Sequence, residues 1–300
     1  MISFENLTGM GYDGYAMFDG IVLPIIKAGN RKEDNNIKGQ NGVGYSPNFG
    51  FGAPVANGRR SFTADFEFEL SKNSWRFLTF LLNTARYEAP TIDLTLPLPI
   101  QLFLSSHSQI KTQIYVEKVG LNSAVDALIT FSVSGRGWIW DRAESWVSPR
   151  EHKVPMNPMD PNFSPLVGYQ SCLDLSMYPE EACQGYSLQL NNKWSFEEEL
   201  TGLDYFPPNP NLVTFEGADV SLTAEWLHLK EKPEPDARGN GVVNFYDPEG
   251  YRKNTKVLMG SLRFPRLVRN STGQDNFAVP NAVSTVSGTY ELVGEGIYVL

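Results

Sequence analysis

The stretch that decides the fold is residues 61–70, SFTADFEFEL. Its even positions are all apolar, and its odd positions are polar or acidic. Alternation this strict predicts a β-strand with one face in a hydrophobic core and the other in water. The carboxylates of Asp65, Glu67 and Glu69 therefore share the solvent face, and three like charges at period two are typical of such a face.

Two pairs of segments in the chain are similar to each other. Residues 62–66 (FTADF) correspond in chemical type to residues 222–226 (LTAEW), and 131–139 (FSVSGRGWI) correspond to 290–298 (YELVGEGIY). The two offsets are nearly equal, so we predict one β unit written twice. The segments 131–139 and 290–298 both contain a charged residue between two glycines, at 135–137 and 294–296. Glycine inside a strand marks a bulge or bend, so we expect both units to bend there.

The first unit also contains a helical stripe. Residues 74–86 follow a potential cap at Asn73 or Ser74 and predict a helix packed on the sheet. The corresponding residues 232–241 of the second unit are rich in Pro and Gly and predict no helix. Further strands are expected at 110–119 and 257–268, and Pro265 makes the latter an edge or bulged strand. The stripe consists of Trp75, Phe77, Leu78, Leu81 and Leu82.

Proline and glycine indicate the domain organisation. Prolines crowd residues 149–168 and predict a stiff surface linker between a first domain, 1–148, and a second domain, 169–300. Residues 29–60 combine seven glycines with isolated aromatic residues, which favours an extended hairpin arm that reaches a neighbouring subunit. A solvent loop is the alternative. The candidate contact residues of the arm are Tyr45, Phe49, Phe51, Arg59 and Arg60.

Composition excludes several classes of protein. The 300 residues are 41% apolar and 20% charged, with a mean hydropathy of −0.28, which excludes a disordered tail and an integral membrane protein. With 25 basic and 34 acidic residues the net charge is −9, which argues against tight binding to a phosphate backbone. The N-terminus lacks the features of a secretory signal, and we expect Cys172 and Cys183 to be free thiols in a reducing compartment.

The sequence contains no recognisable catalytic motif. Nucleophile elbows, zinc-protease motifs, phosphate-binding loops and calcium loops are missing, and the three histidines are scattered. We therefore expect a protein that is not an enzyme and that has no cofactor or metal site. A sugar-binding protein is an alternative, since Trp138, Trp140 and Trp146 could stack on sugar rings. A glycoside hydrolase is a third reading, but the spacing indicates no carboxyl pair about 5–9.5 Å apart.

The layout of these segments resembles the tail-tube fold of bacteriophages. The shared features are the alternating strand before a helix, the long arm between early strands and the closing Gly-x-Gly strand, over residues 20–140 and 185–300. The duplication resembles baseplate-hub proteins and tube proteins with two tube domains in one chain. This resemblance implies a mainly β, mostly antiparallel fold of two tandem β-sandwich or barrel domains, with a flanking helix at least in the first.

The resemblance also implies a function. The protein would be a structural virion protein, namely a tail tube, tube-initiator or baseplate-hub subunit, assembled in the host cytoplasm. Copies would form a ring, either a trimer with quasi-sixfold symmetry or a hexamer, that binds other tail or baseplate proteins. DNA would pass through it as non-specific cargo, without membrane insertion. The alternative is a carbohydrate- or receptor-binding β-sandwich at the tail tip. The candidate residues of an acidic lumen are Asp65, Glu67, Glu69 and Glu225.

Overall fold

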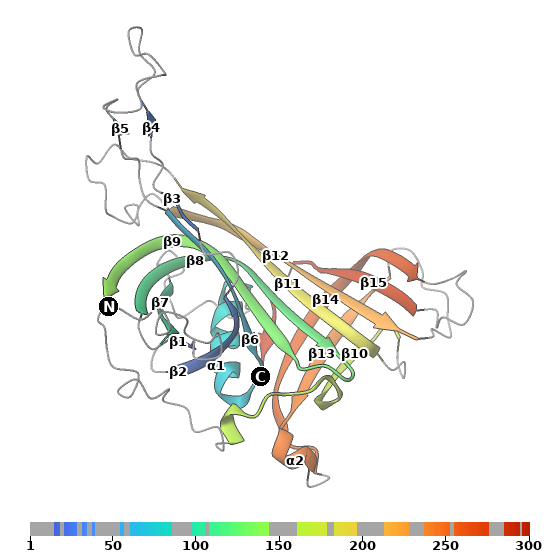
Figure 1. Cartoon of the computed structure of the whole chain (residues 1–300). Coiled ribbons are helices and arrows are strands. Elements are labelled where there is room, and N and C mark those ends of the chain that lie inside the picture. Colours follow the sequence, from blue (N-terminus) through green and yellow to red (C-terminus); the bar gives the residue numbers. More distant parts are fainter. Residues whose placement is uncertain are drawn as a thin grey trace.

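A computed structural model shows a mostly antiparallel β fold with one long helix, which confirms the expected mainly β class (Figure 1). It describes residues 15–18, 21–28, 32–34, 38–39, 55–56, 61–85, 98–105, 108–143, 161–178, 183–196, 213–227, 237–252, 255–275, 285–294 and 296–300. Within these ranges, neither helix is long and apolar enough to cross a membrane.

The strands and helices follow one another in this order. They are β1 Tyr15–Phe18, β2 Ile21–Ala28, β3 Lys32–Asp34, β4 Lys38–Gly39, β5 Val55–Ala56, β6 Ser61–Glu69, α1 Lys72–Leu81, β7 Leu98–Ser105, β8 Ser108–Ala124, β9 Thr130–Ala143, β10 Ser171–Leu175, β11 Cys183–Phe196, β12 Val213–Trp226, β13 Arg238–Tyr246, α2 Pro248–Arg252, β14 Leu258–Asp275, β15 Thr285–Leu292 and β16 Tyr298–Val299.

The strands of the first half close on themselves. Each strand in the order β1-β2-β6-β9-β8-β7 pairs antiparallel with the next, and β7 pairs back with β1. The strands of the second half follow the order β10, then β11-β12-β15-β14-β13, and β13 pairs back with β10. The described strands β10 and β11 share no ladder, so this second circuit is open at one place.

Strand β8 joins the two halves. Its residues 108–114 pair with β7, its residues 118–124 pair with β11, and β9 occupies its other edge. At the branch point the carbonyl of Val116 accepts hydrogen bonds from Asn192 Nδ2 at 2.9 Å and from Trp194 Nε1 at 2.8 Å. These bonds satisfy a backbone acceptor at the place where the sheet divides.

Helix α1 begins earlier than the sequence predicted. Its N-cap is Ser71, whose Oγ accepts from Ser74 N at 3.2 Å, while Ser74 Oγ accepts from Ser71 N at 2.8 Å. This reciprocal pair is a capping box with serine in the place of glutamate, so neither Asn73 nor Ser74 is the cap. After Leu81 the chain continues into a 3-10 turn, Leu82–Ala85.

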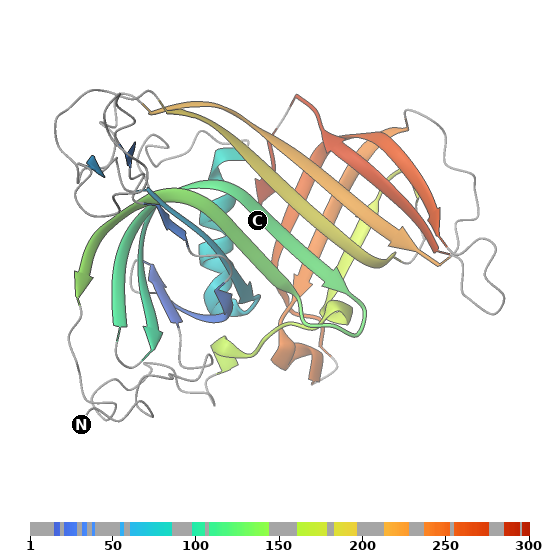
Figure 2. The same ribbon diagram turned by 45° about the horizontal axis from the view of Figure 1, so that its top comes forward.

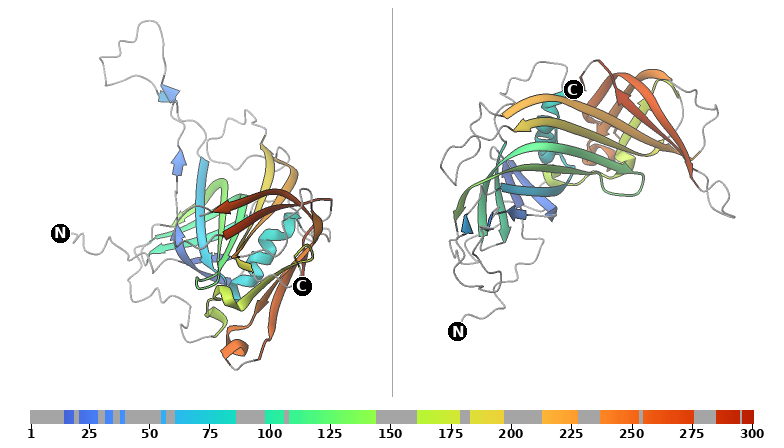
Figure 3. Two further views of the ribbon diagram at one scale, coloured as in Figure 1. Left: turned by 90° about the vertical axis from the view of Figure 1, so that its right-hand side faces the viewer. Right: turned by 90° about the horizontal axis from the view of Figure 1, so that it is seen from above.

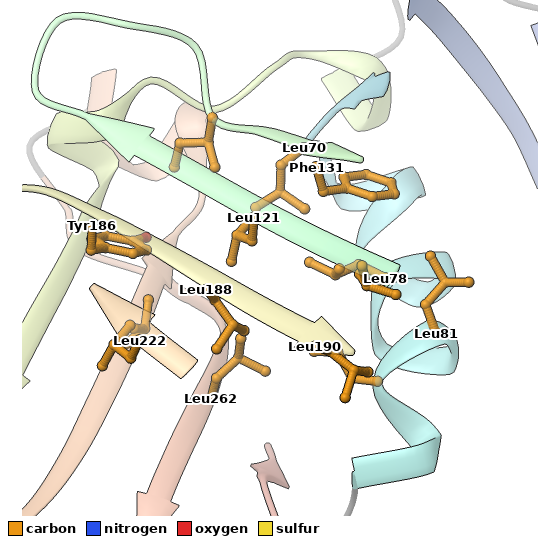
Figure 4. Packing of buried hydrophobic residues seen from close by; sticks show 14 of the residues in the cluster. Leu70, Leu78, Leu81, Leu121, Phe131, Tyr186, Leu188, Leu190, Leu222 and Leu262 are labelled. Carbon is orange, nitrogen blue, oxygen red and sulfur yellow. The ribbon is translucent and has the colours of Figure 1, made fainter. Parts of the chain in front are cut away.

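The helix packs against both halves of the chain (Figure 2). Its buried face enters one hydrophobic core that also contains side chains from β8, β11, β12 and β14 (Figure 4). The ring centroids of Trp75 and Phe245 lie 5.1 Å apart, and a Cβ added to Gly260 would lie 2.5 Å from the Trp75 indole. Lys72 also forms an ion pair with Asp247. The helix expected to flank the first unit therefore lies between the halves.

The two Gly-charged-Gly segments adopt different structures. Gly135 lies inside β9, where a Cβ would meet Tyr115 O at 2.3 Å, and it faces an irregularity in β8 between Val116 and Lys118. Gly294 lies beyond the end of β15 and has a φ of +81°, a left-handed conformation that favours glycine. The expectation of a within-strand bend in both units is thus wrong for the second, where the chain turns before it rejoins β14 as β16.

Pro265 lies inside β14. This strand pairs with β13 along one edge and with β15 and β16 along the other, so it is not an edge strand. The ladder to β13 shifts register between Gly239 and Gly241, close to the proline, and the pairing with β16 gives way there to the pairing with β15. The missing N–H of proline is accommodated at this irregularity, as the bulged alternative predicted.

Part of the expected linker belongs to the packed core. Leu166 is fully buried, its N–H donates to Leu70 O at 2.8 Å, and its carbonyl accepts from Ile129 N at 2.8 Å. Residues 149–160 lie outside the described ranges.

Little of the arm is described. Strand β3 pairs with β6, and β4 pairs with β5 away from the main sheet (Figures 1 and 3). The candidate contact residues of the arm lie outside the described part, namely Tyr45, Phe49, Phe51, Arg59 and Arg60.

Replacing Leu166 by alanine tests the packing of this segment. Because the side chain is fully buried, we expect Leu166→Ala to lower the free energy of unfolding by about 2–5 kcal/mol in urea titrations. Tyr169→Ala, at a side chain that is 48% exposed, is the matched control and should change stability by less than about 0.5 kcal/mol. Equal small effects of the two variants would contradict the buried placement.

Candidate functional site

One face of the sheet is polar across both halves of the chain. In strands β6, β9, β8, β11 and β12, residues at every second position stay in register from strand to strand, so their side chains form rows across the sheet. The first row is Asp65, Ser134, Lys118, Asn191 and Asp219. The second is Glu67, Ser132, Gly120, Gln189 and Ser221, and the third is Glu69, Thr130, Asn122, Ser187 and Thr223.

The other face of the same strands is buried. Phe68, Phe131 and Leu121 lie in line with Leu188 and Leu222, and all are at most 2% exposed. None of the residues in the three polar rows is buried. The sheet therefore separates a core that holds α1 from a polar face that spans five strands, and we define this surface as the polar face.

A hollow of about 530 Å³ lies on the polar face. Glu67 of the first half and Glu225 of the second both line it, together with hydroxyl and amide side chains and the turn at Ala127 and Leu128. The structure therefore brings two of the four candidate lumen carboxylates to one hollow. The other polar side chains that line it are Asn122, Ser123, Thr130, Tyr186, Ser187 and Thr223.

The remaining two carboxylates share the polar face but not the hollow. Asp65 is exposed, and Glu69 is half-buried at the end of its strand. Burial raises the pKa of Glu69 above its ordinary value. Asp65 and Glu69 stand four residues apart on β6, so they do not form an acid/base pair.

Aromatic side chains border one end of the polar face. Tyr115 packs edge-on against Trp194 at 5.3 Å and against Phe196 at 5.4 Å between ring centroids. The Arg136 guanidinium lies 4.2 Å from the centre of the Phe196 ring and forms an ion pair with Glu117 at 2.9 Å. These contacts neutralise the arginine and hold the β11–β12 ribbon against β8 beyond the branch point.

The cysteines lie elsewhere, on β10 and at the start of β11. Both are free thiols, as expected, and both line a second pocket. Burial and the neighbouring Asp174 carboxylate raise the pKa of Cys172 to about 11, and burial raises the pKa of Cys183. Neither environment activates a thiol for nucleophilic chemistry.

Other sequence expectations find no site in the described ranges. No group of three or more His, Cys, Asp and Glu side chains there has the arrangement of a metal site. The side chains of Trp138 and Trp140 and the whole of Trp146 fall outside what the structure describes.

The carboxylates of this face were predicted from the sequence, but the hydroxyl and amide side chains beside them were not. The pattern of residues 186–191, YSLQLN, indicates a strand with one polar face, because Ser187 and Gln189 alternate with Leu188 and Leu190. The strand pairing that aligns them with β8 leaves no such signal in the sequence.

Comparison with known proteins identifies no relative, since no protein-family model and no curated protein matches this chain.

The raised thiol pKa predicts slow alkylation. At pH 8 a thiol of pKa about 11 is about 100-fold less ionised than one at the ordinary value of 9.0. Because the more basic thiolate is also the better nucleophile, iodoacetamide should modify Cys172 about 10- to 100-fold more slowly than a free thiol. The rate should rise about tenfold per pH unit up to about pH 11. Mass spectrometry of Cys183→Ser, with glutathione as the reference, measures this. A rate equal to that of glutathione would contradict the raised pKa of the Cys172 thiol.

Proposed function

We propose that the protein is a structural subunit of a bacteriophage tail, either a tube, a tube initiator or a baseplate hub, that assembles into a ring around a channel for DNA. The observation that carries this proposal is the polar face, which both halves of the chain build in register. A DNA channel needs a continuous wall of this kind, which repels phosphate and offers few cations that could hold it.

The proposed duplication is supported by the order of the strands. The series β1-β2-β6-β9-β8-β7 corresponds strand for strand to β10-β11-β12-β15-β14-β13. Tyr290 on β15, the counterpart of Phe131, pairs with Leu222 as Phe131 pairs with Phe68. By the sequence match of 62–66 with 222–226, the residue that corresponds to Phe68 is 228. Tyr290 pairs with Leu222 instead, which is six residues earlier, and a shift by an even number of residues keeps the same face buried.

The charge of the polar face supports DNA passage. Carboxylates predominate on it, since Lys118 is the only cation in the three rows. The nearby Lys193 and Arg136 are each paired with a carboxylate, at 2.7 Å to Asp219 and 2.9 Å to Glu117. Phosphate passing such a surface would release few counterions, so binding would be weak.

Ring closure would use the ends of the sheet. The path of paired strands begins at β10 and ends at β3, and each has one described strand as its neighbour. Unpaired strand edges favour association with other chains, and cyclic symmetry stops such association from growing without limit. With two units per chain, a trimer would give quasi-sixfold symmetry, and the arm would contact the next ring or the baseplate.

Electron microscopy tests the assembly. We expect negative-stain images of the purified protein, alone or with the other tail proteins, to show threefold or sixfold rings with a central hole. Images of purified virions should place the chain in the tail. A monomer in every sample, including virions, would overturn the proposal.

Charge reversal on the polar face tests the role of the channel. The double variant Glu67→Lys and Glu225→Lys should still form rings but should slow DNA ejection, because lysines bind phosphate. Glu249→Lys, on exposed α2, is the control and should leave ejection unchanged. Ejection rates come from the fluorescence of an intercalating dye as DNA is released. Equal ejection rates for both variants would contradict the proposal that the polar face lines the channel.

A further inference from the structure

The second circuit of strands is open where the first is closed. In the first half, β1 pairs antiparallel with β2 over four residue pairs. The corresponding strands of the second half are β10 and β11, and these share no ladder. Among the described strands, β10 pairs only with β13, whereas β11 pairs with β12 on one edge and with β8 on the other. One edge of β10 therefore has no partner among the described strands.

A slot of about 350 Å³ lies along this edge. Its walls are β10 on one side and the start of β11, residues 183–186, on the other, with Val125 and Tyr169 at one end and Tyr178 at the other. An edge strand turns the N–H and C=O of alternate residues away from its ladder. The slot therefore presents backbone donors and acceptors together with space for a chain beside them.

Hydroxyl groups line the floor of the slot. Ser123 Oγ and Ser171 Oγ lie 3.1 Å apart, and Ser171 Oγ donates to Gly168 O at 2.9 Å. The Tyr186 side chain is 6% exposed, and its hydroxyl lies near both serines. The buried hydroxyl of Tyr178 lies near that of Tyr290. Serine hydroxyls can both donate and accept hydrogen bonds, so this part of the slot favours a polar ligand.

The charge of the slot limits its ligand. Of the residues that line it, Asp174 is the only charged one, and it is exposed on β10. Its carboxylate accepts a weak hydrogen bond from the Cys172 thiol at 3.4 Å. A basic group on the ligand would complement this carboxylate.

We propose that this slot, which we call the β10 slot, binds an extended peptide of another protein that pairs antiparallel with the free edge of β10. The peptide would fill the opening as a neighbour of β10 alone, because β12 and β8 take both edges of β11. Main-chain hydrogen bonds to β10 would provide affinity, and pockets beside the edge would provide specificity. The preferred peptide has small or hydroxyl side chains toward the serines and a Lys or Arg beside Asp174. Peptide binding requires no ring, but ring closure would use the same end of the sheet, so the peptide and a neighbouring subunit would compete for β10.

Selection from a library of random twelve-residue peptides displayed on yeast tests the proposal. We expect enrichment of extended sequences with one basic residue. Synthetic copies should bind the full chain in fluorescence anisotropy, and hydrogen exchange should show new protection of the amides of residues 171–175. Asp174→Lys should weaken binding at least about tenfold, since it replaces attraction by repulsion. Glu216→Lys, a charge reversal at an exposed position of β12, should keep the affinity within about twofold.

A second variant separates binding from folding. Cys172→Trp places a large side chain at an exposed position of β10 and should block the slot while circular dichroism stays unchanged. Either of two results overturns the proposal. One is the absence of any peptide above the library background. The other is peptides that bind Asp174→Lys and Cys172→Trp as tightly as the wild type and leave the β10 amides unprotected.

Discussion

The ladder between β8 and β11 is the constraint on which the rest of the structure depends. Among the described strands it is the only ladder between the halves, and it sets the register of both faces at once. Because side chains alternate with period two, a slip by one residue would turn Leu188 and Leu190 to the solvent and Ser187 and Gln189 to the core. The apolar row against α1 and the polar rows outside are thus consequences of one pairing. The carbonyl of Val116, which accepts two side-chain hydrogen bonds, lies at the point where that pairing ends.

The same ladder accounts for the opening in the second circuit. A strand has two edges, and those of β11 are taken by β12 and β8, so β10 has no edge of β11 to pair with. In the first half β2 has no such outside partner at residues 21–24 and pairs with β1 instead. Joining the halves through one continuous sheet therefore leaves one strand edge exposed. That exposed edge is a structural reason for the β10 slot, and it follows from the junction rather than from any local property of residues 171–175.

Local patterns predicted the parts of the fold that local physics controls. The alternation of residues 61–70 gave the right buried face, and the stripe from Phe77 to Leu82 gave the right buried face of α1. The cap was missed because Ser74 takes the place usually held by Glu or Gln in a capping box. Proline crowding suggested a free linker, yet Leu166 is held by backbone bonds to Leu70 and Ile129, which are distant in sequence. The rows of the polar face were beyond prediction for the same reason, since β8 and β11 pair across sixty residues of chain that carry no signal for it.

The chemistry of the polar face bears on how DNA would move past it. A wall that repels phosphate strongly would raise the energy of DNA in the channel, and a wall that attracts it would hold the DNA in place. The third row has short neutral side chains at its centre, Thr130, Asn122 and Ser187, with the Glu69 carboxylate at one end. Neutral hydroxyl and amide groups exchange hydrogen bonds with water at little net cost. The nearest arginine is held by Glu117 and by the Phe196 ring, so it offers no free fork to a phosphate. If this face borders the channel, as we propose, the pairing of its cations matters as much as its acidic excess, because one unpaired arginine would bind the phosphates that the carboxylates repel.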